Sequence, residues 1–284
     1  MEELQFAFDK NKWILVEFNV DLMKTLYSGQ VFNFIRTKND EYCGFVGDDL
    51  LILRQKQKYF EFLDLTENTK KAVYNFFNLD ITMDFDFYQQ PGLRFLTNDF
   101  ISTTFSFICS QNNNVKRITK MVSFLYSKGD YVRYEDCNIY KFVNPKNFMK
   151  LIDIDKFTNE MNLNGFGYRS KYIVDALKAF CTNDNLSEEY MRSIGYEDAR
   201  NNLLRIKGIG KKVADCICLM SLKYFHIVPI DTHILKFSIK QFKIKDLNNK
   251  KYEIIQEKWK EVYGKYAGIA QLHIFKAYLD KTIK

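Results

Sequence analysis

Residues 201–237 read NNLLRIKGIGKKVADCICLMSLKYFHIVPIDTHILKF, and this stretch is the most informative part of the sequence. One helix is predicted to end near Ile206 and a second to begin near Lys212, with Gly208 and Gly210 between them. Glycines at a helix start let backbone N–H groups turn outward without a Cβ in the way, so such a hairpin can hold a phosphate at the positive end of the helix dipole. A lone Gly-x-Gly is also common in an ordinary turn between helices. The neighbouring residues are therefore needed to distinguish a phosphate-binding hairpin from such a turn.

A lysine and an aspartate flank the second helix of this hairpin. Lys212 falls in its first turn, where the helix dipole disfavours a cation and so favours a neutral, nucleophilic amine. After about three turns of helix, the chain can return and place Asp231 beside Lys212. Two plainer interpretations stay open: Asp231 caps a helix that begins at Thr232, or Lys212 pairs with Asp215 three residues on.

The composition is that of a globular protein, since 46% of the 284 residues are hydrophobic. The formal charge of +7 favours a polyanionic partner, although many proteins without a nucleic-acid function are this basic. Six cysteines (43, 109, 137, 181, 216 and 218) and three histidines show no metal-ligand spacing, so we expect reduced thiols, no metal and no other cofactor. No apolar run approaches the ~20 residues that span a bilayer, and the N-terminus lacks a signal-peptide pattern. We therefore expect a soluble, intracellular protein.

The periodicity of apolar residues changes near residue 95. Short β-rich runs at 13–20, 31–36, 41–46, 50–54 and 59–65 precede a helix at about 67–78, which predicts an antiparallel sheet with a covering helix. From about residue 98 the period becomes helical, with apolar faces at 100–108, 115–125, 172–180 and 269–279. The predicted class is α+β, with a sheet domain over 1–95 and a helical body over 96–284.

The pattern Leu-x-x-Ile-x-Gly-Ile-Gly-x-Lys, followed by Val-Pro-x-Asp-x-His, resembles the signature of the helix–hairpin–helix superfamily of base-excision DNA glycosylases. Lys207 departs from it, because proline commonly stands there, but both glycines are in place. The run from Lys212 to Met220 is further similar to the 8-oxoguanine DNA glycosylase/AP lyase family. This resemblance implies that the sheet domain is TATA-binding-protein-like. It also implies an all-helical body of two lobes with the site between them.

The resemblance recurs at residues 28–32 and 266–275 and there implies a pocket for the damaged base. The carbonyl of Gly29 would accept the N7 proton that 8-oxoguanine has and guanine lacks. Gln271 offers a donor and an acceptor to the Watson–Crick edge. Phe275 would stack on one side of the flipped base, with Cys216 on the other and Met220 in the same pocket. On composition alone, Cys216, Met220 and Phe275 would be core residues.

Two further segments, 105–118 and 167–169, resemble the parts of that family that enter the duplex. The resemblance implies that they fill the gap left by the flipped nucleotide and read the unpaired cytosine. The plainer interpretation is a turn or cap for the asparagine and solvated surface charges for the arginines. The complete set of implied DNA contacts is Asn112, Arg117, Tyr168, Arg169, Gly208, Gly210 and His233.

The family resemblance implies a bifunctional enzyme, a DNA N-glycosylase with AP lyase activity that removes 8-oxoguanine, preferably opposite cytosine. Asp231 would stabilise positive charge on the sugar, and Lys212 would attack the anomeric carbon to give a Schiff base and β-elimination. The implied partner is duplex DNA containing the lesion, bound by a monomer without a membrane. The expected location is the nucleus in a eukaryote or the nucleoid-associated cytoplasm in a prokaryote.

Two alternatives come from outside this family. Another glycosylase of the superfamily would usually carry a four-cysteine iron–sulfur loop after the aspartate, and here no cysteine follows Cys218. An alkyl-base glycosylase would lack Lys212. A non-catalytic DNA-binding module would bind in a salt-sensitive way without regard to the lesion, and it gives no reason for Asp231 or for Gln271 beside Phe275.

Overall fold

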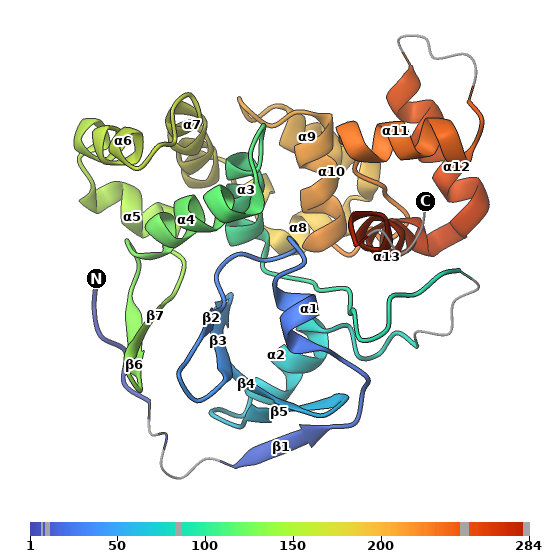
Figure 1. Cartoon of the computed structure of the whole chain (residues 1–284). Helices are drawn as coiled ribbons and strands as arrows, with labels where there is room; N and C mark the ends of the chain where they lie inside the picture. The colour runs from blue at the N-terminus through green and yellow to red at the C-terminus, as the bar shows by residue number, and fades with distance from the viewer. Residues whose placement is uncertain (7, 9–11, 83–86, 245–249, 281–284) are drawn as a thin grey trace.

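The computed structural model describes residues 1–6, 8, 12–82, 87–244 and 250–280. Its N-terminal part is a five-stranded antiparallel sheet of strand order β1-β5-β4-β3-β2. The strands are β1 (Trp13–Val16), β2 (Ile35–Arg36), β3 (Glu41–Val46), β4 (Asp49–Lys56) and β5 (Tyr59–Leu63). The sheet lies below a large helical body in Figure 1. The predicted α+β class, with an antiparallel sheet before a helical body, is confirmed.

Both faces of the sheet are buried, which explains the continuous apolar run in β4. Side chains alternate between the faces of a strand, so Leu51 and Leu53 pack with helices α1 (Leu22–Leu26) and α2 (Thr69–Phe76). Leu50 and Ile52 face the other way and pack with Val132 and Ile139. The sheet therefore has a helical cover on one face and a second cover on the other.

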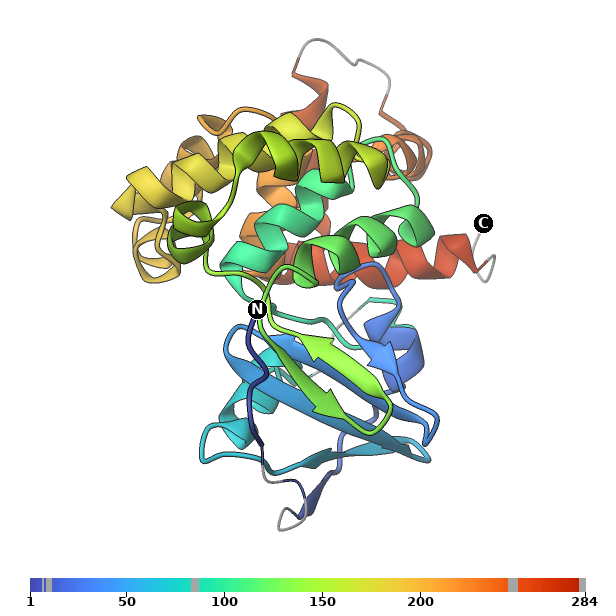
Figure 2. The same cartoon turned by 90° about the vertical axis from the view of Figure 1, so that its left-hand side faces the viewer.

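The second cover is a hairpin from the helical region, formed by β6 (Tyr131–Tyr134) and β7 (Cys137–Tyr140). Figure 2 shows it leaning against the sheet, with the N-terminal segment beside it. Glu3 bridges to Tyr131 in parallel fashion. This hairpin was not predicted from the sequence. Each of its strands has four residues with one buried side chain, so the alternation of apolar and polar residues that indicates a strand is almost absent.

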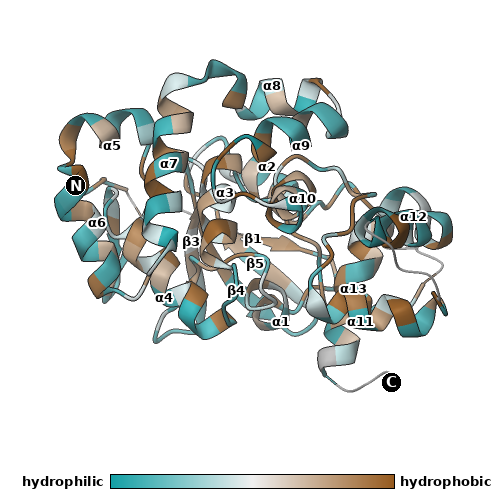
Figure 3. Ribbon diagram, turned by 90° about the horizontal axis from the view of Figure 1, so that it is seen from above, coloured by the Kyte–Doolittle hydropathy of each residue, from teal (hydrophilic) through white to brown (hydrophobic). Residues whose placement is uncertain are grey.

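The helical body is built around α3 (Phe100–Cys109), of whose ten residues nine are buried. Around it lie α4 (Val115–Tyr126), α7 (Arg169–Thr182), α9 (Tyr196–Leu204) and α10 (Lys211–Met220), as Figure 3 shows from above. A separate apolar cluster around Trp259 joins α11 (Thr232–Gln241), α12 (Lys251–Tyr263) and α13 (Ala267–Leu279). The remaining helices are α5 (Pro145–Leu151), α6 (Ile154–Leu163), α8 (Glu188–Ser193) and the 3-10 turns Asp184–Leu186 and Gly264–Tyr266.

In the part of the chain that the structure describes, no helix combines the length and the apolar composition needed to cross a bilayer.

Candidate active site

The turn between α9 and α10 has one glycine that packing requires and one that faces open space. Gly208 has φ +91°, and a Cβ added there would overlap the ring of Tyr172. Gly210 caps α10, and no atom lies within 4 Å of the position of an added Cβ. No side chain caps the N-terminus of α10. The first N–H groups of α10 are therefore left for an external acceptor such as a phosphate.

Lys212, in the first turn of α10, is half-buried at the end of α3. Its Nζ lies 3.4 Å from the Ser110 hydroxyl and 5.2 Å from the centroid of the Phe107 ring. It does not pair with Asp215, because that carboxylate is fully buried and bonded to Arg200 and three other donors. The alternative in which Lys212 serves only as a partner of Asp215 is therefore wrong.

Asp231 is the N-cap of α11, as one plainer interpretation predicted. Its Oδ1 accepts hydrogen bonds from the backbone N–H groups of His233 and Ile234, at 2.9 and 2.8 Å. Both capping bonds go to Oδ1, so Oδ2 accepts none from any residue that the structure describes. The carboxylate can thus cap the helix with one oxygen and present the other to a ligand.

The thiol of Cys216 lies in the neighbourhood of both Lys212 and Asp231. Burial raises the pKa of this thiol to about 11, the nearby Lys212 charge opposes the rise, and the Asp231 charge makes a smaller contribution that raises it. Cys216 itself lies one helical turn after Lys212. The charges of two residues that the sequence separates by a helix and a loop therefore both influence this thiol.

Four of the five predicted base-recognition residues lie on α10 and α13. Cys216 and Met220 are buried on α10, and Gln271 is buried on α13. Gln271 donates no side-chain hydrogen bond to, and accepts none from, the described part of the chain, so its amide is available to a ligand. Half-buried Phe275 lies one turn further along α13, with its ring centroid 6.1 Å from that of His233.

Gly29 comes from the sheet domain, in the turn that follows α1. Its φ of +90° is one that few residues other than glycine adopt. The next residue, buried Gln30, donates to the carbonyl of Arg94 and accepts from the N–H of Leu96, at 3.0 and 2.8 Å. Gln30 thereby anchors the Gly29 turn to the segment that leads into the helical body.

The predicted DNA-entering residues form a cluster beyond the end of α3. Asn112 has φ +44°, and its Nδ2 lies 3.5 Å from the hydroxyl of exposed Tyr168. Arg117 is directed to the same region, where it donates to the carbonyl of Gly165 at 2.7 Å. His233 is exposed in the first turn of α11.

Arg169 differs from the other residues of this cluster, because it is only 3% exposed. Its guanidinium donates to the carbonyls of Gln111, Asn112 and Phe166, at 3.0, 3.1 and 3.2 Å. Arg169 therefore holds the loop that contains Asn112. A direct contact with a base would require the side chain to give up some of these carbonyls.

Two residues that support the site, Gln111 and Asp215, were not among the predicted site residues. Gln111 donates to the carbonyl of Gly208 at 2.9 Å and so links the Asn112 loop to the hairpin. Asp215 is the centre of a buried polar network, which a charge inside the apolar run 213–219 could have indicated.

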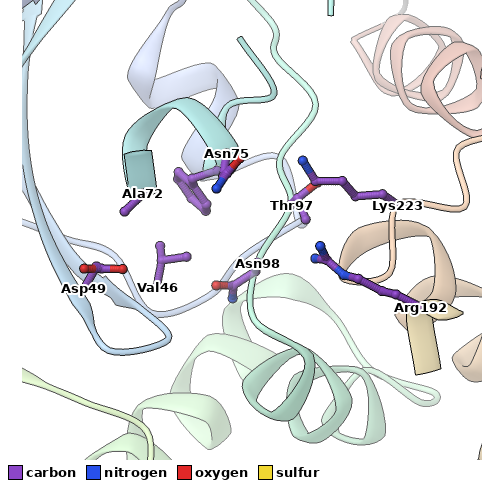
Figure 4. Close-up of a pocket in the computed structure, with 9 residues that line it drawn as sticks. Val46, Asp49, Ala72, Asn75, Thr97, Asn98, Arg192 and Lys223 are labelled. Atoms are coloured by element: carbon purple, nitrogen blue, oxygen red, sulfur yellow. The ribbon is translucent and has the colours of Figure 1, made fainter. Parts of the chain in front are cut away.

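A cavity with a volume of about 190 Å³ lies away from this site (Figure 4). It opens between α2 and the α8 end of the helical body, and Arg192 and Lys223 extend into it. Its lining residues are Val46, Asp49, Ala72, Asn75, Phe76, Thr97, Asn98, Arg192 and Lys223. No cluster of three or more His, Cys, Asp or Glu suited to a metal occurs in the described ranges.

Comparison with known proteins points to one group of enzymes. Residues 14–91 match the family model described as the N-terminal domain of 8-oxoguanine DNA glycosylase. The chain is 29% identical to N-glycosylase/DNA lyase OGG1 of Arabidopsis thaliana over 305 aligned residues, covering 96% of this chain and 82% of that protein. It is 31% identical to the N-glycosylase/DNA lyase of Saccharomyces cerevisiae, covering 67% of this chain and 58% of that protein.

Solved structures support the same fold. The structure of MBOgg1 with a low-affinity DNA ligand superposes with a TM-score of 0.83 at 21% identity, covering 99% of this chain and all of that one. The Clostridium acetobutylicum 8-oxoguanine glycosylase/lyase, bound to DNA with cytosine opposite 8-oxoguanine, gives a TM-score of 0.81 at 22% identity and covers both chains completely.

Proposed function

Since this chain belongs to the 8-oxoguanine DNA glycosylase/AP lyase family of the helix–hairpin–helix superfamily, we propose that it excises 8-oxoguanine from duplex DNA and then cleaves the strand. The observation that carries the proposal is the half-buried Lys212 in the uncapped first turn of α10, with the charge of Asp231, whose Oδ2 is left without a partner by the described residues, influencing the same Cys216 thiol as the lysine. A phosphate at that N-terminus would position the deoxyribose of a flipped nucleotide next to both side chains.

The two residues divide the proposed chemistry. As the glycosidic bond breaks, the Asp231 carboxylate stabilises positive charge on the sugar. Once the Lys212 ammonium has given up a proton, its amine forms a bond to the anomeric carbon, and the electrons of the glycosidic bond leave with the base, which takes up a proton. The nitrogen lone pair then expels the ring oxygen from that carbon, so the deoxyribose ring opens, the ring oxygen takes up a proton to become a hydroxyl, and a Schiff base forms. Removal of a proton from the adjacent carbon then expels the 3′ phosphate by β-elimination.

The surrounding residues recognise the lesion in this proposal. The Gly29 carbonyl accepts the N7 proton of 8-oxoguanine, which undamaged guanine lacks, so guanine would leave that acceptor unpaired. Gln271 bonds to the Watson–Crick edge, because its amide has no other partner within the described chain. Phe275 and Cys216 contact the two faces of the base, and Met220 completes the pocket.

The Asn112 cluster takes the place of the flipped nucleotide and gives a preference for cytosine on the opposite strand. Tyr168 is 46% exposed and so is available to enter the stack. Arg117 and Arg169 supply the donors for the unpaired cytosine, Arg169 after release from its loop carbonyls. Gly210 and His233 contact the phosphate backbone.

A single-turnover cleavage assay with 8-oxoguanine opposite each of the four bases tests this function, with undamaged guanine as the control duplex. We expect excision fastest opposite cytosine and no excision of guanine. Lys212→Gln is expected to lose strand cleavage, because the amide cannot form a Schiff base. Equal binding of damaged and undamaged duplexes without cleavage would instead indicate a non-catalytic DNA-binding protein.

A further inference from the structure

Asp215 is a fully buried carboxylate that accepts four hydrogen bonds. Oδ1 accepts from the Tyr196 hydroxyl at 2.9 Å and from Nε of Arg200 at 2.8 Å, both on α9. Oδ2 accepts from the Tyr252 hydroxyl at 2.7 Å and from Nε2 of Gln256 at 2.8 Å, both on α12. Burial raises the pKa of this carboxyl, while the donors, Tyr252 foremost, lower it.

Tyr252 and Gln256 each make a second hydrogen bond, and both of these bonds are to the backbone of the loop before Asp231. The Tyr252 hydroxyl accepts from the backbone N–H of Ile230 at 3.1 Å. Nε2 of Gln256 donates to the carbonyl of Val228 at 3.0 Å as well as to Asp215. The backbone directly before Asp231 is thus tied through two side chains to one oxygen of Asp215.

The network connects the backbone before Asp231 to α10, and Lys212 is on that same helix. Lys212 precedes Asp215 by three residues on α10, so the same rigid helix carries the lysine and the buried carboxylate. Two loosely joined segments would let Lys212 and Asp231 drift relative to each other. A displacement of about 1 Å in a reacting group can lower a rate about a hundred-fold, so a fixed link between the two segments has a direct consequence for catalysis.

We propose that Asp215, through Tyr252 and Gln256, is a positioning group. It holds the backbone of Val228 and Ile230, and with it the following Asp231, at a fixed position relative to Lys212. This inference rests on the proposed glycosylase function. It assigns no contact with DNA to Asp215. The donors from α9 are not part of the link, because Tyr196 and Arg200 bond to Oδ1 and neither is hydrogen-bonded to the described residues of the loop. The Tyr196 ring contacts that loop at His226, a contact that Tyr196→Phe keeps.

Two matched variants of the full-length chain test the proposal. Tyr252→Phe and Tyr196→Phe each remove one hydroxyl that donates to the same carboxylate, and only the first also releases the loop N–H of Ile230. The readouts are the single-turnover rate of base excision on an 8-oxoguanine:cytosine duplex and the Kd for that duplex. Both are measured at least 10 °C below the lower of the two thermal midpoints.

We expect Tyr252→Phe to lower the excision rate about ten-fold or more and to leave Kd within about two-fold, because the DNA contacts are intact. Tyr196→Phe is expected to stay within about two-fold of the unsubstituted chain in both quantities. Gln256→Leu, which frees the Val228 carbonyl, should resemble Tyr252→Phe.

Equal losses of rate in the two tyrosine variants would show that the network only stabilises the fold, and would overturn the proposal. An unchanged rate in Tyr252→Phe would overturn it as well. Failure of the unsubstituted chain to excise the base would count against the proposed function instead, so the two failures are distinguishable.

Discussion

Asp231 caps α11 with one carboxylate oxygen and leaves the other without a partner in the described chain. Asn caps a helix as well as Asp does, so Asp231→Asn can keep both backbone hydrogen bonds while it removes the charge. We expect the free energy of unfolding to change by less than about 0.5 kcal/mol and the excision rate to fall about a hundred-fold or more.

Asp231→Ala is the control for this substitution, because it removes the cap together with the charge. It should lose about 1 kcal/mol of stability in chemical denaturation and lose activity to the same extent as Asp231→Asn. Full activity in Asp231→Asn would mean that the residue is a cap and nothing more.

His273 is buried on α13, and in the sequence it lies between Gln271 and Phe275, which are proposed to bind the base. Its Nδ1 accepts from the backbone N–H of Gln90 at 3.0 Å, and its Nε2 has no hydrogen-bond partner among the described residues. Burial lowers the pKa of this histidine to about 4. The folded chain therefore keeps it neutral at pH values where the unfolded chain, with an ordinary histidine pKa near 6.5, binds a proton.

Stability should consequently fall as the pH drops from about 6.5 towards 4, since the unfolded state binds more protons in that window. His273 alone contributes a loss of roughly 1 kcal/mol between pH 7.5 and 5.5. Urea denaturation at both pH values measures this loss, and His273→Asn, which keeps an acceptor for Gln90, should reduce it. The same pH dependence in both proteins would contradict the buried, neutral state.

The hairpin between α9 and α10 could be predicted as an element from the sequence, because glycine spacing and helical periodicity are local properties. The different functions of its two glycines could not be predicted from the sequence. The difference depends on Tyr172 of α7, which lies against Gly208 and not against Gly210. Gly208→Ala should cost about 2 kcal/mol or more of stability, because the positive φ and the overlap with Tyr172 both oppose it. Gly210→Ala should cost less than about 1 kcal/mol.

The two variants also differ in the expected effect on DNA. At Gly210 the added Cβ meets no protein atom but lies where a phosphate would approach, so binding of undamaged duplex should weaken. Fluorescence anisotropy at fixed salt measures this effect. A Gly208→Ala protein as stable as Gly210→Ala would show that the close approach to Tyr172 is not required.

Other elements show the same limit of local patterns. The longer strands of the main sheet could be predicted because each has several alternating or apolar residues, whereas only two residues of the predicted run 31–36 form β2. The β6–β7 hairpin was missed because Val132 and Ile139 gain their burial from a sheet about eighty residues earlier in the chain. The links of Asp215 to Tyr252 and Gln256 were missed for the same reason, since α12 approaches α10 only in the folded chain.

At the scale of the whole molecule, the proposed function requires Gly29 of the sheet domain to contribute to a site whose other proposed residues belong to the helical body. Gln30 fixes that turn through Arg94 and Leu96, so the segment between the two parts sets the position of the Gly29 carbonyl. Gln30→Leu should destabilise the chain by about 1–3 kcal/mol, because buried backbone groups lose their partners. It should also reduce the preference for an 8-oxoguanine duplex over an undamaged duplex about ten-fold.

Gln55→Leu provides a matched control. Gln55 also bonds to several backbone groups, including the carbonyl of Val20 and the N–H of Leu22, but these lie at the start of α1 and not at the Gly29 turn. Its loss should destabilise the chain similarly and leave the ratio of the two Kd values unchanged. Equal loss of discrimination in both variants would assign the effect to stability alone.

The central claim is that Lys212 forms the covalent bond to the sugar. Borohydride reduction during the reaction with an 8-oxoguanine:cytosine duplex, followed by digestion and mass spectrometry, locates that bond directly. The predicted result is one reduced adduct, on the peptide that contains Lys212, and no adduct with Lys212→Gln. An adduct on another lysine, or undiminished trapping with Lys212→Gln, would contradict the account.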